Sequence, residues 1–225
     1  MSPEDEAQIG KDAHPKILKA YGGIYEDEKL GAYIAGVTMR IARASDLPDI
    51  PYTVSVLDSP VVNAFALPGG KVGVNTGLFK VAKDDNQLAT VMAHEVGHAI
   101  ARHGSERMSQ QMAVQAGLAG LGIAGGQAAQ YAELAAAAAT LGVILPFSRT
   151  QEAEADHIGV VMMAKAGYDP RASVTLWENF AKLGGPRQPE FLSTHPAPTS
   201  RIENLKALMP EAMAIYKKSP KAPTS

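Results

Sequence analysis

The sequence predicts an α+β fold that is mostly helical and includes a small antiparallel sheet. Apolar residues recur at helical spacing over most of the 225-residue chain. One region, residues 46–79, instead has strand-like alternation and turn signals. Apolar residues make up 46% of the chain, which is enough for a sizeable core. We expect one domain over residues 1–215 and a frayed tail at 216–225.

The composition excludes several classes of protein. A net charge of −2 with 46% apolar residues excludes a disordered chain and argues against a nucleic-acid partner. The absence of cysteine excludes a disulfide scaffold and any thiolate metal site. Residues 1–6 lack a basic region followed by an apolar run, so we expect no signal peptide in this chain. The same start is compatible with a mature sequence from which a signal was removed.

Two helices are expected in the N-terminal region, residues 4–44. Ser2 suits an N-cap, Pro3 suits the first helical position, and acidic residues follow in the first turn. Gly22–Gly23 interrupts the pattern. It resumes over 27–44, where the spacing of the apolar residues predicts one buried helix face.

Three short strands are expected over residues 46–79. Tyr52–Leu57 alternates between apolar and polar residues. Asn63–Leu67 and Lys71–Asn75 flank Pro68–Gly70, a turn sequence typical of a hairpin. We expect the three strands to form an antiparallel sheet beside the helix that follows.

Four helices are expected in the rest of the chain, each marked by a capping residue at its start or by glycine and proline at its end. They cover Gln87 to about Arg102, Ser148–Ala166, Ala172–Leu183, and a final helix opened by Thr199 and Ser200. We expect a loop over Arg187–Pro198, before the last helix.

A stretch rich in alanine and glycine separates the first two of these helices. It is uncharged over Met108–Ala132 and again over Leu134–Ser148. A membrane span needs about 20 predominantly apolar residues, and the glycines and glutamines here weaken that interpretation. Three alternatives stay open: buried helices, a mobile hairpin, or peripheral membrane contact through residues 112–147.

His94, Glu95 and His98 form the strongest chemical pattern. Positions i and i+4 share a helix face, so both imidazoles can place a nitrogen about 2.0–2.1 Å from one zinc ion. Glu95 points elsewhere around the helix, where it can accept a proton from a water at the metal without ligating it. The pattern predicts one Zn²⁺ per chain and hydrolysis of a carbonyl compound.

A catalytic zinc needs a third protein ligand, and without cysteine that ligand must be His, Asp or Glu. His103 lies off the shared face, near the expected helix end. In the dense cluster 151–157, Glu152 and Asp156 share a helix face and can both point into one site, whereas Glu154 points elsewhere. The alternative for this cluster is a solvated charged face.

Several motifs follow one another in a fixed order. They are Asn63–Gly70, His94-Glu95-x-x-His98, Ser148-Arg149-x-x-Glu152-x-Glu154-Ala155-Asp156, His195-Pro196 and Arg201. Together they resemble the HtpX, BepA and CAAX prenyl protease family of zinc metallopeptidases, over about residues 4–210. The resemblance implies a zincin-like metallopeptidase of gluzincin type. The chain lacks the membrane helices of HtpX and the tetratricopeptide repeats of BepA, so it is most similar to soluble, extracytoplasmic members, which implies the periplasm or cell envelope.

The same resemblance implies roles for further residues. Glu152 becomes the third zinc ligand, and Asp156 either orients a ligating histidine or pairs with Arg201. His195 or Arg201 stabilises the oxyanion of the reaction. Alternatively, His195 binds as a fourth ligand and holds the enzyme latent.

An edge of the predicted hairpin can hold a polypeptide substrate as an added strand. The candidates are Ala64, Phe65, Ala66 and Leu67, or the segment Val72–Asn75; alternatively, the hairpin only supports the zinc helix. We therefore expect a zinc metalloendopeptidase that hydrolyses unfolded or misassembled proteins. The alternatives are a chaperone-like protein that binds clients at a capped zinc site, and a membrane-associated assembly factor. The oligomeric state stays open.

Overall fold

The computed structural model describes residues 2–47, 49–120, 147–183, 189–196 and 200–223. The chain is mostly helical and has one three-stranded sheet, which confirms the predicted α+β class. The helices are α1 (Pro3–Ala20), α2 (Glu28–Arg43), α3 (Asp85–Ile100), α4 (His103–Gly120), α6 (Arg149–Lys165), α7 (Ala172–Lys182), α8 (Glu190–Thr194) and α9 (Arg201–Lys218). The strands are β1 (Thr53–Leu57), β2 (Ala64–Leu67) and β3 (Lys71–Asn75), with short 3₁₀ helices η1 (Pro68–Gly70) and η2 (Thr76–Lys80).

Capping residues begin four of the helices, and of these Ser2 and Asp84 were predicted as caps. Ser2 and Ser148 form complete capping boxes at α1 and α6. Asp27 and Asp84 accept backbone hydrogen bonds at the starts of α2 and α3. Gly167, with φ 86°, follows the end of α6. Local sequence therefore marks the start of α3 and both ends of α6, the two helices that carry most of the site.

The sheet is mixed, which corrects the prediction of an antiparallel one. β2 and β3 form the expected hairpin, but β1 pairs with β3 in parallel, in the order β1-β3-β2. β1 therefore lies on the side of β3 away from β2, and the Ala66 backbone in β2 bonds to Glu95 of α3. β3 is therefore central. The expectation that Val72–Asn75 offers an edge is wrong, because both sides of that strand are paired.

Two further boundaries differ from those expected. The predicted loop 187–198 contains α8. This five-residue helix forms because Phe191 is buried and its backbone N–H donates to the Val62 carbonyl at 3.2 Å, a tertiary anchor that local sequence does not reveal. In addition, α9 runs to Lys218, past the expected domain end at 215. That residues 1–215 form a single domain stays a prediction.

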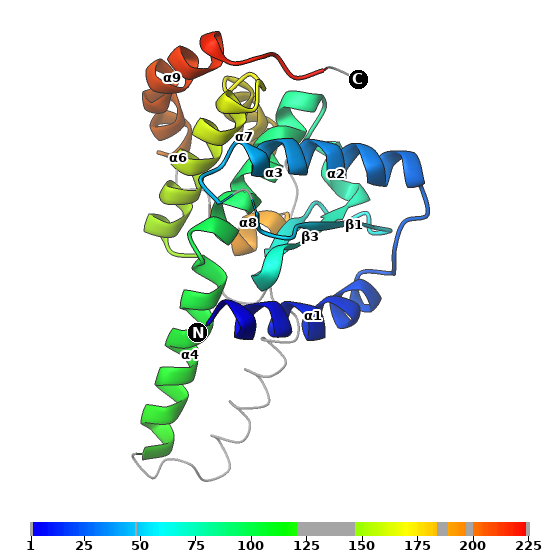
Figure 1. Ribbon diagram of the computed structural model, residues 1–225, viewed down its shortest axis with the longest axis vertical. Coiled ribbons are helices and arrows are strands. Elements are labelled where there is room, and N and C mark those ends of the chain that lie inside the picture. The colour runs from blue at the N-terminus through cyan, green and yellow to red at the C-terminus, as the bar shows by residue number, and fades with distance from the viewer. Residues whose placement is uncertain (1, 48, 121–146, 184–188, 197–199, 224–225) are drawn as a thin grey trace.

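α3 lies at the centre of the molecule, between the sheet with α2 on one side and α6 on the other (Figure 1). Two glycines allow α3 and α6 to approach closely. A Cβ on Gly97 would lie 3.0 Å from the Ala155 carbonyl oxygen, and one on Gly159 would lie 3.1 Å from the backbone of Ala93. This close crossing brings Glu152, in the first turn of α6, beside the histidines of α3.

The segment for which membrane contact was considered, residues 112–147, lies largely outside the described residues. α4, which leads into it, projects away from the rest of the described chain (Figure 1). Within the part of the chain that the structure describes, no helix is both long and apolar enough to cross a membrane.

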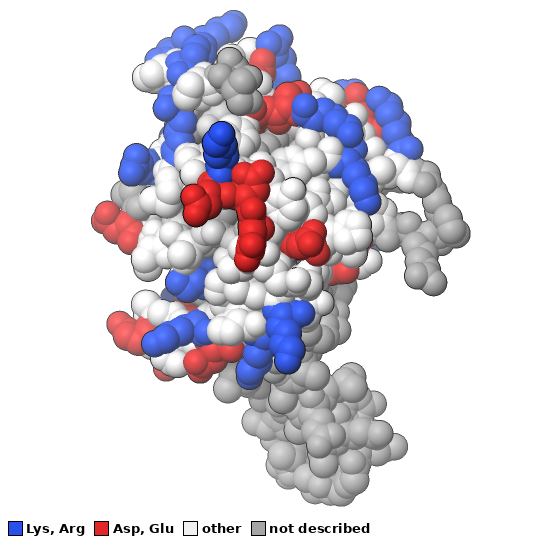
Figure 2. Space-filling view, turned by 90° about the vertical axis from the view of Figure 1, so that its right-hand side faces the viewer, with Lys and Arg blue, Asp and Glu red and all other residues white. Residues whose placement is uncertain are grey.

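Charge is mixed on the face shown in Figure 2. Acidic side chains gather near the centre of this face, and basic side chains lie above and below them. The described residues of this face therefore form no continuous basic surface, in keeping with the net charge of −2.

Candidate metal centre

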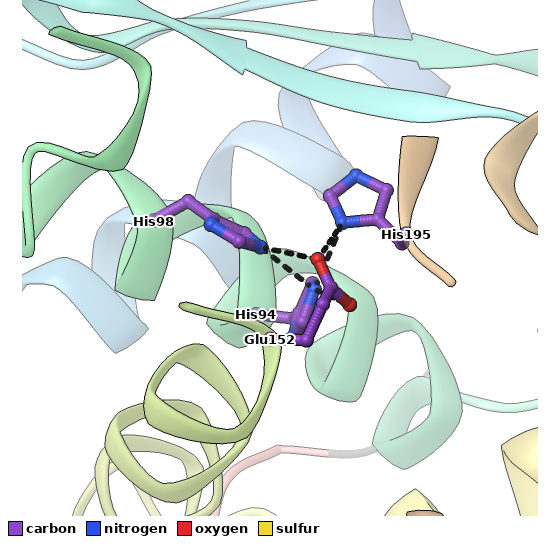
Figure 3. A group of neighbouring side chains, drawn as sticks. All are labelled: His94, His98, Glu152 and His195. Atoms are coloured by element: carbon purple, nitrogen blue, oxygen red, sulfur yellow. Dashed lines mark hydrogen bonds and ion pairs between the residues drawn. The ribbon is translucent and has the colours of Figure 1, made fainter. Parts of the chain in front are cut away.

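α3 carries His94, Glu95 and His98 within two turns. Figure 3 shows His94 and His98 side by side, as their spacing predicts. The Nε2 atoms of the two histidines lie 3.0 Å apart and point the same way. All three side chains are buried, with exposures of 4%, 1% and 3% respectively. Polar groups so deeply buried need partners, and most of these come from other helices.

α6 supplies Glu152. Its Oε1 lies 3.3 Å from His98 Nε2, and its Oε2 lies 3.5 Å from His94 Nε2. The side chain is 2% exposed, so this face of α6 is not a solvated charged face. The structure therefore places the expected third ligand beside both histidines.

His195 enters from the C-terminal end of α8 (Figure 3). Its Nδ1 lies 3.1 Å from His94 Nε2 and 2.9 Å from Glu152 Oε1. Its Nε2 lies 3.4 Å from Glu95 Oε1. The ring stacks on Phe191, with centroids 4.5 Å apart. His195 therefore contacts the donor cluster through Nδ1 and the expected general base, Glu95, through Nε2.

These donors fit a four-coordinate metal ion. One nitrogen or oxygen from each of His94, His98, Glu152 and His195 lies within 4.8 Å of all the others. With Oε1 as the Glu152 donor, four separations between donor atoms fall between 2.9 and 3.3 Å. Tetrahedral zinc with bonds of about 2.0–2.1 Å sets its ligand atoms about 3.3 Å apart. Glu95 Oε1 lies beside the cluster without a hydrogen-bond partner among the described residues, which leaves an acceptor for water.

Asp156 and Arg201 lie behind the donor atoms. Asp156 Oδ1 lies 3.0 Å from His94 Nδ1 and accepts a 2.6 Å hydrogen bond from Arg201 Nη2. Arg201 Nη1 donates to Glu152 Oε2, also at 2.6 Å. The guanidinium is buried and stacks 3.7 Å above the Trp177 ring. Both contacts expected of Asp156, to a cluster histidine and to Arg201, are therefore present.

Burial and mutual charge determine the pKa values of the cluster. Burial opposes the charge on His94, but Glu152 and Asp156 outweigh it and raise the pKa of His94 to about 9. Burial raises the pKa of Glu95 to about 8 and lowers the pKa of His195 to about 4. Burial also opposes ionisation of Glu152, yet His94 and the hydrogen bonds from the imidazoles hold its pKa well below the usual range.

Comparison with known proteins identifies the family. Residues 28–209 match the model of peptidase family M48. This chain belongs to peptidase family M48. The resemblance to HExxH zinc metallopeptidases that the sequence motifs predicted is thereby confirmed.

Three M48-like relatives are similar over most of this chain. It is 35% identical over 222 residues to the mitochondrial metalloendopeptidase OMA1 of Schizosaccharomyces pombe, covering 94% of this chain and 63% of that protein. It is 42% identical over 182 residues to the mitochondrial metalloendopeptidase OMA1 of Arabidopsis thaliana, covering 78% and 36%. It is 31% identical over 215 residues to the beta-barrel assembly-enhancing protease of Escherichia coli, covering 92% and 44%. The chain therefore spans less than two thirds of the length of each relative.

Sequence reasoning missed two side chains of this M48 site. The Phe147 ring stacks on His98 at a centroid distance of 3.9 Å, and its backbone N–H donates to the Thr194 carbonyl at 3.0 Å. His103, set aside as off the helix face, is buried with its Nδ1 2.9 Å from His98 Nδ1. Local sequence does not indicate a role for Phe147 in the site, because this residue simply lies near the end of an uncharged stretch. The signal for His103 was its nearness to the end of α3, where the chain can turn back.

Proposed function

We propose that this chain is a zinc-dependent endopeptidase that hydrolyses peptide bonds in unfolded or misassembled proteins. The observation that carries the proposal is the buried convergence of His94, His98 and Glu152 beside Glu95. Membership of peptidase family M48 supports it, as do relatives named metalloendopeptidase or protease. These names favour catalysis over the client-binding alternative.

The metal identity and the ligand set belong to this proposal. Two imidazoles and a carboxylate are a donor set that zinc takes in hydrolytic sites, with Glu152 as the gluzincin-type third ligand. When bound, zinc supplies a Lewis acid that polarises the scissile carbonyl and lowers the pKa of water. Its positive charge also favours the ionised form of Glu95, whose pKa burial otherwise raises to about 8.

Glu95 is the proposed general base. Its Oε1 has no hydrogen-bond partner among the described side chains and faces the cluster, so it can accept the proton of an attacking water. Glu95 also bonds to the Ala66 backbone, which fixes its position relative to β2. Asp156 and Arg201 are proposed to hold His94 and Glu152 in place through the contacts described above.

His195 is the proposed hydrogen-bond donor to the oxyanion. It is neutral near pH 7 because burial lowers its pKa to about 4. It lies between the metal donors and Glu95, where the carbonyl oxygen develops charge. The position of its Nδ1 also suits a fourth metal ligand that holds the enzyme latent. Arg201, the other candidate for this role, already bonds to carboxylates through both its terminal nitrogens.

The substrate is proposed to bind as an added strand along Ala64, Phe65, Ala66 and Leu67. β2 is an edge strand whose outer side faces α3 and the catalytic glutamate. Main-chain pairing tolerates many sequences, which suits unfolded polypeptides. A mostly apolar cavity of about 290 Å³ runs from Ala66 and Leu67 to His98 and can accept side chains of such a strand.

Metal content measured together with casein cleavage tests the proposal. We expect one zinc per chain in the wild type and in Glu95→Gln, with the cleavage rate of the variant lower by about 10²–10⁴. Glu211→Gln, at an exposed position, is the matched control and should cleave like the wild type. Full activity in Glu95→Gln would contradict the role of Glu95. Zinc in both forms with cleavage in neither would favour the client-binding alternative.

Two further parts of the proposal concern the surroundings of the protein. We propose an extracytoplasmic location from the motif resemblance, while the relatives named as mitochondrial come from another compartment. Peripheral membrane contact through residues 112–147 is a second proposal, based on a sequence in which Glu133 is the only charged residue. Cell fractionation tests the first, and liposome flotation with and without this segment tests the second.

A further inference from the structure

The chain reverses direction after α3, and this reversal places His103 against the side of His98 that faces away from the donor cluster. α3 ends at Ile100, and Arg102 takes the left-handed conformation with φ 56°. Its side chain donates to Glu6 at 2.7 Å, which ties the turn to α1. The chain can then begin α4 at His103 with the imidazole directed back at His98. The two Nδ1 atoms lie 2.9 Å apart, and His103 is only 2% exposed.

The positions of the nitrogens determine which atom carries each proton. His98 Nε2 points into the donor cluster, so metal binding uses its lone pair and leaves the proton on Nδ1. That N–H must find an acceptor, and the atom opposite is His103 Nδ1. A neutral His103 that accepts at Nδ1 carries its own proton on Nε2. This second N–H faces Glu154 Oε2 at 3.3 Å, so every proton in the chain of contacts has an acceptor.

The two cluster histidines of α3 are therefore held differently. His94 Nδ1 meets the buried carboxylate of Asp156 directly, at 3.0 Å. His98 meets the buried imidazole of His103, and the carboxylate behind it, Glu154, is 55% exposed. A metal-binding histidine is commonly oriented by a carboxylate, a carbonyl or water. Here a second histidine takes that place.

We propose that His103 is a positioning residue of the metal centre. It accepts the Nδ1–H of His98, fixes the tautomer and the ring orientation in which His98 Nε2 can bind the metal, and is itself oriented by Glu154. This inference rests on the proposed zinc site and concerns a residue that does not touch the metal.

Two substitutions distinguish the effect of losing the hydrogen-bond acceptor from the effect of changing the side-chain volume. In His103→Asn, the Oδ1 atom can occupy the place of Nδ1 and still accept the proton from His98. In His103→Gln, the amide lies one carbon further along the side chain, near the former Nε2 and within reach of Glu154, so no acceptor occupies the place of Nδ1. His157→Gln is the matched control, because His157 is a half-exposed histidine of α6 that pairs with Glu211 away from the site.

The measurement is zinc affinity and release rate, by competition with a chromophoric chelator, and it does not depend on activity. We expect His103→Gln to lower zinc affinity about 10–100-fold. We expect His103→Asn and His157→Gln to stay within about threefold of the wild type. Urea unfolding of the metal-free forms shows which variants fold, and the comparison is made between folded ones. Should the glutamine variant not fold, the asparagine variant still tests the idea, because a large loss of affinity there overturns it.

Equal affinities in all variants, or equal losses in the asparagine and glutamine variants, would overturn the role of His103. A wild type that binds no zinc would instead overturn the proposed function. Nitrogen-15 spectra of the histidine side chains in the zinc-loaded protein give a direct check. His98 should carry its proton on Nδ1 in the wild type and exchange it more slowly than in His103→Gln; a proton on Nε2 would refute the proposal.

Discussion

Replacing Gly159 with alanine tests whether the close crossing of α3 and α6 positions the metal site. The added Cβ would lie 3.1 Å from the carbonyl carbon and oxygen of Ala93 and from the His94 nitrogen. These are backbone atoms and cannot rotate away. α6 must therefore move back from α3 by a few tenths of an ångström, and Glu152 moves with it while His94 and His98 stay on α3.

The expected change in the free energy of unfolding of Gly159→Ala is the sum of two opposing contributions. Alanine is more favourable than glycine in a helix interior by about 1 kcal/mol. Overpacking at a close contact costs about 1–3 kcal/mol. Gly36, in α2, is the matched control, because no described atom outside its own helix lies within 4 Å of an added Cβ. The free energy of unfolding should rise by about 1 kcal/mol in Gly36→Ala and fall by about 0–2 kcal/mol in Gly159→Ala.

Urea unfolding of the metal-free proteins measures this difference, and chelator competition then measures zinc affinity. Each kcal/mol corresponds to about 2–4 °C in Tm for a chain of this size, so calorimetry provides a second estimate. Zinc affinity should fall in Gly159→Ala and stay unchanged in Gly36→Ala. The reasoning is refuted if Gly159→Ala gains as much stability as Gly36→Ala and binds zinc like the wild type.

Three other predictions concern the cluster itself. Glu152→Ala should lower the zinc content below one per chain, whereas the exposed Glu211→Ala should not; an unchanged content, by elemental analysis, removes Glu152 from the ligand set. His195→Ala should keep its zinc and lose about 10²–10³ in kcat/KM against casein, whereas a gain in activity would show that His195 blocks the site. Zinc binding at pH 7 should release about two protons, because the pKa of His94 is raised to about 9 and that of Glu95 to about 8. Zinc affinity should therefore rise with pH and level off above about 9; calorimetry in buffers of different ionisation enthalpy counts the protons, and release of fewer than one contradicts the prediction.

Much of the fold follows from local sequence, and the exceptions depend on contacts between distant segments. Caps such as Asp84 and Ser148 are read within a few residues of the helices they begin. The alternation in β1 predicts a strand but contains no information on its partner or direction, so the parallel pairing with β3 was not foreseen. α8 forms because Phe191 anchors it to Val62, and its own five residues carry little helical signal.

The site likewise contains residues that local sequence predicts and residues whose positions depend on contacts between distant segments. The positions of His94, Glu95 and His98 follow from the periodicity of one helix. Motif resemblance was needed to choose Glu152 from its acidic neighbours and to include His195, because their contacts depend on how helices cross. His103 was set aside because the helical pattern was extended past Ile100. A non-glycine residue in the left-handed conformation, Arg102 here, has no local sequence signal that marks it, and it is the residue that turns His103 back onto the site.

The buried charges of the site would couple metal binding to the proposed catalysis. Without metal, the positive charges of His94 and Arg201 balance those of Glu152 and Asp156, and Glu95 is mostly protonated at pH 7 because burial raises its pKa to about 8. If His94 bound a divalent ion, it would lose its proton, and the two charges of the ion would leave one uncompensated positive charge. Buried net charge is costly, so ionisation of Glu95 is favoured. An ion bound by the cluster would thus convert Glu95 to the form that the proposed mechanism requires, and the count of released protons tests the proposed general base as well as the proposed ligand.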